Sequence, residues 1–302
     1  MSHDTNTTGV VTLAGAGPGD PDLLTVGAAR ALSRADVVVY DHLVAPEVLE
    51  LAPPHALRIP VGKHPFGEQV AQQTINSILV REGSLGRNVV RLKGGDPFIF
   101  GRGAEEIEAL HAAGIPFRVI PGVSSLNGVL GPAGFSLTSR GRNHGFTVVS
   151  GAGSTSADEI RRWAAAPGPL VIFMGVHRAA EISRELAAGG LDPATPVALV
   201  ARGGTPQELV VETTLAGLPV EAADPRALTP ALIVVGIARE RAFAGRPLDG
   251  RVAVLPGRLD SPVADALRAL GARVARQAAE GAPAHPLARN THLGEPQARP
   301  EI

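Results

Sequence analysis

Short apolar runs alternate with amphipathic stretches along residues 10–120. A run rich in Val, Leu or Ile is typical of a buried strand, whereas apolar residues three or four positions apart indicate a helix. The expected strands are 10–14, 36–40, 58–61, 88–92 and 117–120, and the expected helices are 23–33, 68–81 and 103–113. This alternation predicts a mostly parallel α/β domain over residues 10–120.

A second series of the same kind begins after residue 120. Its expected strands are 146–150, 170–174 and 196–201, and its expected helices are 157–166 and 179–188. Two further β-rich runs, 207–213 and 231–235, suggest a hairpin-like end to the sheet. We therefore predict a second α/β domain over residues 121–240.

The two ends of the chain have a different character. Past residue 246, a strand at 250–256 and a helix at 262–270 are expected, and 272–275 could start another strand. We assign residues 247–280 to a partial βα unit. Residues 1–9 are polar and 281–302 lack any apolar periodicity, so both segments are expected to be disordered.

The amino-acid composition argues against several classes of protein. The 302 residues include 28 Lys and Arg against 29 Asp and Glu, so the basic excess typical of nucleic-acid binders is missing. There is no Cys, which excludes disulfides and fits a reducing, cytoplasmic location. No signal peptide is recognised, and no apolar run approaches the roughly 18 residues of a membrane span. The 9 His lack the close spacing of metal ligands, so no metal is expected.

Glycine or polar residues follow the first four predicted strands. They are Pro18-Gly19-Asp20, Asp41, Gly62-Lys63 and Gly94-Gly95-Asp96. Ligands of open α/β sheets bind beyond the carboxyl ends of the strands, and glycine lets a ligand approach the backbone. Such loops at successive strands favour a binding crevice over simple turns. A dinucleotide site is disfavoured, because Pro18 removes a backbone N–H and no GxGxxG spacing follows.

Four segments carry a resemblance to a known family: VTLAGAGPGDPDLLT at 11–25, VYDHLV at 39–44, VGK at 61–63 and RLKGGDPFIFGRGAEE at 91–106. They resemble the uroporphyrinogen-III C-methyltransferases of the tetrapyrrole methylase family, and the match extends over residues 10–240. The resemblance implies two S-adenosylmethionine-dependent methyl transfers to uroporphyrinogen III, through precorrin-1 to precorrin-2, in siroheme and cobalamin biosynthesis. It also implies two α/β domains with the methyl donor in the cleft between them, and a homodimer.

The resemblance assigns donor-binding residues position by position. In the first half they are Pro18, Gly94, Gly95, Asp96, Ile99, Ser124 and Ser125. In the second half they are Met174, Gly203, Pro230 and Ala231. Considered alone, Met174 ends a strand and is expected to pack in the core.

The resemblance further implies that Asp41 is the proton acceptor and Lys63 the proton donor. Polar groups around the tetrapyrrole would be Arg102, Glu105 and Arg140. Taken singly, Asp41 could equally be a turn residue, Lys63 a solvated charge and Glu105 a helix-dipole partner.

The chemistry accounts for these residue types. The substrate carries carboxylates, which Arg binds well, so Arg91, Lys93 and Arg142 are also candidate substrate cations. The pyrrole carbon is electron-rich and can attack the sulfonium methyl directly, so catalysis depends mostly on alignment. A carboxylate such as Asp41 or Glu105 could accept a released proton or stabilise developing charge.

Two alternatives are left open. One is a methylase of the same fold for a later corrinoid, a diphthamide-pathway protein or ribosomal RNA. The other is a non-catalytic protein that binds donor or tetrapyrrole, favoured by departures from the family pattern at 137–141, 150–152 and 201–203. The C-terminal segments 247–256 and 266–272 resemble the beginning of uroporphyrinogen-III synthase, so 247–280 is interpreted as a remnant of that enzyme.

Overall fold

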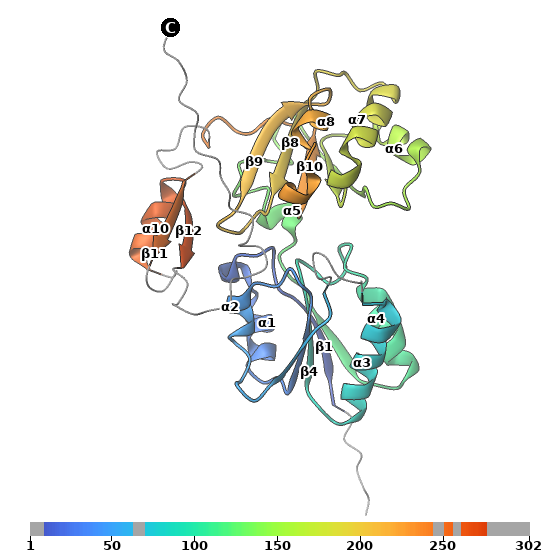
Figure 1. Cartoon of the computed structure of the whole chain (residues 1–302), viewed down its shortest axis with the longest axis vertical. Coiled ribbons are helices and arrows are strands. Elements are labelled where there is room, and N and C mark those ends of the chain that lie inside the picture. Colours follow the sequence, from blue (N-terminus) through green and yellow to red (C-terminus); the bar gives the residue numbers. More distant parts are fainter. Residues whose placement is uncertain (1–8, 63–69, 244–250, 256–260, 277–302) are drawn as a thin grey trace, which may run out of the picture.

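The computed structural model describes residues 9–62, 70–243, 251–255 and 261–276. One five-stranded sheet with its helices occupies the first half of the chain, a second five-stranded sheet follows, and a small third unit comes last (Figure 1). The segments expected to be disordered, 1–9 and 281–302, lie outside the described ranges except for Gly9. Within those ranges, no helix has both the length and the apolarity needed to cross a bilayer.

The first sheet is parallel throughout. Its strands are β1 (Val11–Gly15), β2 (Val37–Tyr40), β3 (Leu57–Pro60), β4 (Val89–Lys93) and β5 (Phe117–Ile120). They lie in the order β3-β2-β4-β1-β5, and every neighbouring pair runs in the same direction. The predicted α/β class and parallel sheet are therefore confirmed. All five carboxyl ends meet at one edge, and the central strands β1 and β4 are buried along their whole length.

Different helices cover the two faces of this sheet. They are η1 (Pro21–Leu23), α1 (Val26–Leu32), α2 (Pro46–Leu49), α3 (Gln72–Ser84) and α4 (Gly103–Ala112). Strand side chains alternate between faces. Val38 accordingly packs with α1 and α2, whereas Val37 and Val39 pack with α3 and α4. The helix expected at 23–33 begins only at Val26, because the Thr25 hydroxyl accepts a hydrogen bond from the Ala28 amide and caps it.

The second sheet is mixed. Its strands are β6 (Thr147–Ser150), β7 (Leu170–Phe173), β8 (Pro196–Ala201), β9 (Leu209–Thr214) and β10 (Ala231–Val235), in the order β6-β7-β10-β8-β9. The helices of this half are α5 (Ser125–Gly128), α6 (Ala157–Trp163), η2 (Val176–Arg178), α7 (Ala179–Ala188), α8 (Leu218–Glu221) and α9 (Pro225–Leu228). The domain boundary at residue 120 stays a prediction; it falls between β5 and α5.

The prediction that this sheet has a hairpin-like end is wrong. β10 lies between β7 and β8 and is antiparallel to both, whereas β9 pairs with β8 at the edge. The continuous apolar run of β10 is buried on both faces, which only a central position provides. β9 contains Glu212 and Thr residues and has no buried position, as suits an edge strand.

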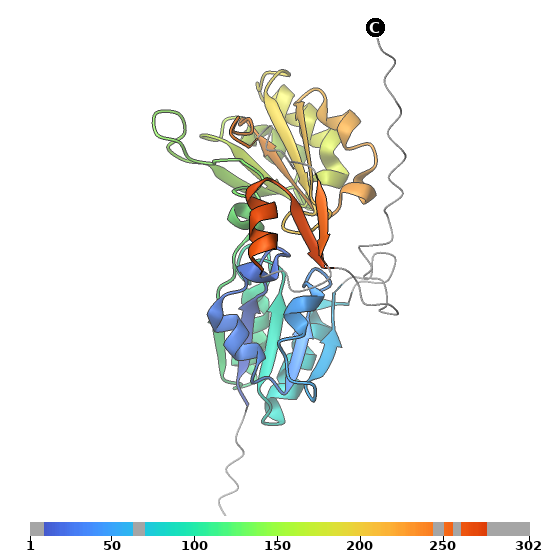
Figure 2. The same ribbon diagram turned by 90° about the vertical axis from the view of Figure 1, so that its left-hand side faces the viewer.

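The third unit is a small βαβ arrangement. β11 (Val252–Leu255) and β12 (Arg273–Arg276) form a parallel pair linked through α10 (Pro262–Ala269). Figure 2 places this unit beside the junction between the two large sheets. Arg268 of α10 lies 3.6 Å from the Asp22 carboxylate of η1. The origin of this segment as a synthase remnant stays a prediction.

We expect Gly122→Ala to destabilise the fold by about 1–3 kcal/mol, as overpacking does. A Cβ on Gly122 would collide with the Gly95 carbonyl oxygen and lie 2.7 Å from the Gly15 Cα. Urea unfolding would measure the loss. The matched control is Gly153→Ala, because a Cβ there meets nothing within 4 Å. Equal stabilities for the two variants would contradict the packing described here.

Candidate functional site

The loops after β1 and β4 are joined into one platform. Gly17 and Gly95 form an antiparallel bridge, in which the Gly95 amide donates to the Gly17 carbonyl at 2.7 Å and the Gly17 amide donates back at 3.3 Å. Both glycines have positive φ, +77° and +66°, a region that residues with a Cβ rarely adopt. The bridge holds the two central loops side by side at the carboxyl edge of the sheet.

Asp96 ties the loop after β5 to the same platform. Its Oδ2 accepts from the Gly122 amide at 3.0 Å, and its Oδ1 accepts from the Phe98 amide at 2.8 Å. Gly95 faces the backbone of Ser124 and Ser125. A Cβ built on Gly95 would lie 3.9 Å from the nearest atoms of both residues. The structure therefore brings the first-half donor-binding candidates into one neighbourhood.

Contacts from the second half close the other side of this neighbourhood. A Cβ on Gly19 would lie 3.0 Å from the Thr205 side chain, and one on Gly204 would lie 3.5 Å from Pro18. The loop after β8 thus packs directly against the loop after β1. The Arg202 amide in turn donates to the Pro230 carbonyl at 2.7 Å, which places Pro230 and Ala231 beside the same loop.

An aromatic contact joins the two halves at a second point. The rings of Phe100, in the loop after β4, and Phe173, at the end of β7, have centroids 5.0 Å apart. Their chain neighbours Ile99 and Met174 are 39% and 51% exposed. The expectation that Met174 packs in the core is therefore wrong, and it lies on the surface beside the interdomain contact.

Asp41 heads a buried cluster of charges. Its Oδ1 accepts from Arg91 Nη2 at 2.5 Å, and Arg91 Nε donates to Glu106 Oε1 at 3.0 Å. Lys93 Nζ donates to the same Glu106 oxygen at 2.7 Å. Arg91, Lys93 and Glu106 are almost completely buried, whereas the Asp41 side chain keeps 30% of its surface exposed.

The burial of this cluster lowers the pKa of Lys93. Loss of water lowers the pKa of its ammonium from the ordinary value, and the nearby Arg91 guanidinium lowers that pKa further. The carboxylates of Glu106 and Asp41 act in the opposite direction. The expectation that Arg91 and Lys93 hold substrate carboxylates is wrong, because both side chains are buried and engaged with carboxylates of the chain itself.

Sequence reasoning missed Glu106 as part of this cluster. It belongs to the segment 91–106 that carries the family resemblance, but the resemblance assigns it no role. Arg91 and Lys93 stand two residues apart in an otherwise apolar strand, so both point to the face covered by α4. Two cations on a buried face require an acidic partner. That requirement was the signal for Glu106.

Arg102 and Glu105 pair with each other at the start of α4. The guanidinium donates to both carboxylate oxygens, at 2.7 and 2.6 Å, and both side chains are about half-exposed. This pairing raises the pKa of Arg102 and lowers the pKa of Glu105. Both groups are therefore charged at neutral pH, and the half-exposed Arg102 guanidinium is accessible to an anionic ligand.

Of the remaining two catalytic candidates, only Arg140 can be placed, and it lies away from this cluster. Lys63 lies outside the described residues. Gly62 packs so closely on His42 that a Cβ would lie 2.5 Å from the His42 Cβ, so the described residues just after β3 lie beside the loop that carries Asp41. Arg140 is exposed and lines a hollow with Thr138, Ser139, Asn143 and His144.

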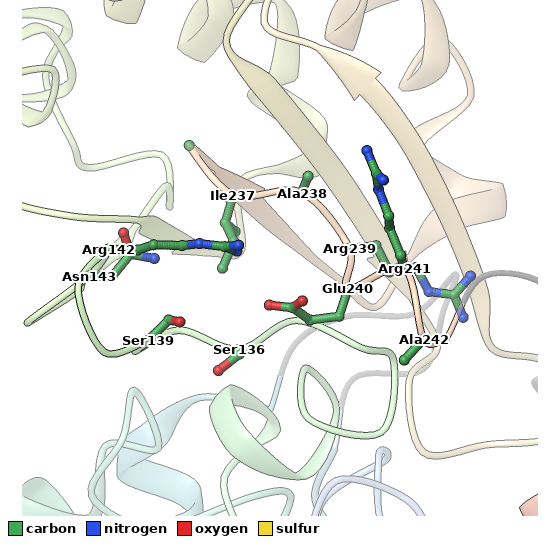
Figure 3. Close-up of a pocket in the computed structure, with 11 residues that line it drawn as sticks. Ser136, Ser139, Arg142, Asn143, Ile237, Ala238, Arg239, Glu240, Arg241 and Ala242 are labelled. Carbon is green, nitrogen blue, oxygen red and sulfur yellow. The ribbon is translucent and has the colours of Figure 1, made fainter.

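A larger cavity of about 590 Å³ lies next to this hollow. Figure 3 shows Ser136, Ser139, Arg142 and Asn143 on one wall and the segment from Ile237 to Ala242 on the other. Among the residues that the structure describes, no predicted donor-binding or catalytic residue lines this cavity. Arg142 belongs to this cavity and not to the charge cluster around Asp41.

Comparison with known proteins gives consistent likenesses. A profile of the tetrapyrrole (corrin/porphyrin) methylases matches residues 10–219. Siroheme synthase 1 of Yersinia enterocolitica is 47% identical over 230 residues, which are 76% of this chain and 48% of that protein. The siroheme synthase of Azotobacter vinelandii is 46% identical over 231 residues, 76% of this chain and 50% of that protein. The chain thus spans about half the length of the curated relatives it matches.

Solved structures show the same likeness, and the match extends over nearly the whole of the solved chain. The uroporphyrin-III C-methyl transferase of Thermus thermophilus, complexed with S-adenyl homocysteine, is 42% identical with a TM-score of 0.65. The match covers 76% of this chain and 97% of that one. A cobalt precorrin-4 methyltransferase, at 24% identity and a TM-score of 0.68, shares the fold.

We expect Glu106→Gln to lower the free energy of unfolding by about 3–5 kcal/mol, because two buried cations lose their shared carboxylate. Its matched control is Glu105→Gln on the same helix, where the carboxylate is exposed and little stability should be lost. Chemical denaturation of both variants at pH 7 provides the comparison. Similar losses in the two variants would mean that the buried cluster does not depend on the charge of Glu106.

Proposed function

The chain belongs to the family of tetrapyrrole (corrin/porphyrin) methylases, and from that membership we propose that it transfers methyl groups from S-adenosylmethionine to uroporphyrinogen III. Two transfers would convert the substrate through precorrin-1 to precorrin-2, for siroheme and cobalamin biosynthesis. The observation that carries the proposal is the junction at which the loops after β1, β4 and β5 meet the loop after β8. The complex of the Thermus thermophilus enzyme with S-adenyl homocysteine supports the identity of the donor.

The residues at the junction fit such a donor. Gly94 and Gly95 leave room for close approach to the backbone, because a Cβ on either would meet no atom nearer than 3.4 Å. Met174 and Ile99 offer exposed apolar surface on opposite sides of the interdomain contact. We assign the donor to this junction, with Pro18, Gly203, Pro230 and Ala231 at its rim. The bound donor supplies an electrophilic methyl group on a sulfonium sulfur.

Asp96 has a supporting part in this assignment. Both of its carboxylate oxygens already accept hydrogen bonds from backbone amides of the chain. Ser124 likewise uses its hydroxyl to accept from the Leu126 amide at 3.2 Å. These two residues shape the donor loops, and any contact of theirs with the donor would be additional to that role.

The acceptor is proposed to lie on the side of Asp41. An electron-rich pyrrole carbon needs no protein nucleophile, so the chain has to align it with the methyl group and receive the proton released afterwards. Asp41 is a partly exposed carboxylate at this edge and is our proposed proton acceptor, with Lys63 as the proposed donor. The exposed cation of Arg102, flanked by Glu105, would bind a substrate carboxylate, and Arg140 would add another.

The proposal is limited to methyl transfer. The homodimer, the cytoplasmic location and the absence of a nucleic-acid partner stay predictions. The buried Asp41 cluster and the exposed Arg102 favour a catalytic, anion-binding protein over a non-catalytic one. An assay with uroporphyrinogen III distinguishes this reaction from methylation of another acceptor.

We expect the purified chain to add two methyl groups to uroporphyrinogen III under anaerobic conditions. Mass spectrometry of the tetrapyrrole and the yield of S-adenosylhomocysteine provide the measurement. Donor binding without any methyl transfer would refute the proposed acceptor and favour another one.

Two substitutions should separate the donor side from the acceptor side. Gly95→Val should weaken donor binding by at least about tenfold, because a β-branched residue at φ +66° is strained and fills the backbone approach. Arg102→Ala should lose turnover while S-adenosylhomocysteine affinity, measured by calorimetry, is kept. If Arg102→Ala loses donor affinity instead, or Gly95→Val keeps it, the corresponding placement is wrong.

A further inference from the structure

We infer that Arg91 is a positioning residue: held in place by Glu106, it fixes the carboxylate of Asp41 at the carboxyl edge of the first sheet for methyl transfer. The inference rests on the proposed function, because Asp41 has a chemical role only if the acceptor binds at this edge. The observation behind it is one buried guanidinium that bridges two carboxylates of different elements.

The position of Arg91 in the sheet determines where its side chain can reach. It lies in the middle of β4, paired with Val39 of β2 on one side and Leu13 of β1 on the other. Asp41 follows the carboxyl end of β2, and Glu106 lies in the first turns of α4. An arginine at this position can therefore span from the helix layer to the edge of the sheet where the loops gather.

The hydrogen bonds leave Arg91 little freedom to move. Nε donates to Glu106, Nη2 donates to Asp41, and Nη1 donates to the Leu92 carbonyl at 3.2 Å. A planar guanidinium with three nitrogens bonded to three separate acceptors has a fixed plane and direction. Arg91 thus presents one N–H at a defined point, and Oδ1 of Asp41 occupies that point.

Glu106 is in turn held by more than one group. Its Oε1 also accepts from Lys93 and, at 3.3 Å, from the Gln72 side chain of α3. The cluster contains two cations, Arg91 and Lys93, and two carboxylates, Glu106 and Asp41. Since Lys93 and Arg91 share one oxygen of Glu106, the attraction between Arg91 and Asp41 balances the cationic charge that remains.

The exposure of Asp41 distinguishes this arrangement from a purely structural ion pair. The three other members are buried, but Asp41 keeps 30% of its side chain accessible. Within the described residues, no hydrogen bond reaches its second oxygen, Oδ2. One oxygen is therefore anchored to Arg91 while the other stays open to a ligand, as a proton acceptor requires.

A second buried carboxylate in the same half provides the structural counterpart. Glu82 of α3 is 3% exposed and pairs with Arg81 at 2.7 Å and with Arg87 at 2.5 Å. Arg87 precedes β4, so this cluster lies near the amino end of the strands, away from the loops that gather at the carboxyl edge. Arg87→Met thus breaks an ion pair with a buried carboxylate without approaching the site, although the Arg87 side chain itself is 43% exposed.

The test is a double-mutant cycle between Arg91→Met and Asp41→Asn, with uroporphyrinogen III and S-adenosylmethionine as substrates. Asp41→Asn should lower kcat by about 100-fold or more, the usual contribution of a general base. Arg91→Met should lower kcat by about tenfold and leave S-adenosylhomocysteine affinity and the KM for the donor unchanged, because only orientation is lost. The double variant should be no slower than Asp41→Asn, since residues that act through one group are not additive.

Controls separate positioning from loss of fold. Arg87→Met should keep the wild-type kcat, and Arg91→Lys should recover part of the activity because it restores the cation without the fork of donors. Thermal unfolding and circular dichroism verify that each variant is folded. If Arg91→Met does not fold, Arg91→Lys takes its place in the cycle with the same non-additivity expected.

Four outcomes would overturn the inference. A folded Arg91 variant with wild-type kcat, or losses that multiply in the double variant, would show that Arg91 does not act through Asp41. Full activity of Asp41→Asn would remove the group that Arg91 is inferred to position. A wild-type chain that transfers no methyl group would overturn the proposed function and the inference with it. The other outcomes overturn the inference while methyl transfer by the wild-type chain still stands, so the two failures can be told apart.

Discussion

Close backbone contact among Gly15, Gly95 and Gly122 is the constraint on which the candidate site depends. A Cβ on Gly15 or Gly122 would collide with the backbone of the neighbouring loops, so the loops after β1, β4 and β5 can meet only where no side chain intervenes. The Gly17–Gly95 bridge and the bonds from Asp96 then fix the loops in register. Everything assigned to donor binding in the first half lies on this platform.

The charge cluster behind the platform follows a different physical rule. Burying Arg91 and Lys93 costs free energy unless each cation is paired and hydrogen-bonded, and Glu106 and Asp41 supply that pairing. Such clusters are seldom the most stable way to fill a core. The buried Arg91 guanidinium holds the partly exposed Asp41 carboxylate in a defined direction. Apolar side chains in the same positions would not orient that carboxylate. If Asp41 is the proton acceptor that we propose, stability and chemistry are linked through the same four side chains.

Membership of the tetrapyrrole methylases and the geometry of the junction support each other. The second sheet contributes the loops around Gly203, Met174 and Pro230, and these reach the first sheet through Gly19, Pro18 and the Phe100–Phe173 contact. A site divided between two halves in this way depends on how they are held together. The third unit touches the same region through Arg268 and Asp22, close to the loop that carries Pro18.

The sequence by itself determined the class of fold, the parallel first sheet and the family, because apolar periodicity and the glycine motifs are local signals. The glycine loop at Gly94-Gly95 was recognisable for the same reason. The tertiary structure decided which strands pair and which side chains contact each other. It placed β10 between β7 and β8, exposed Met174, and engaged Arg91 and Lys93 with Glu106 instead of a substrate. Pairing between distant strands and between buried charges depends on which side chains meet across the core, and no local pattern contains that information.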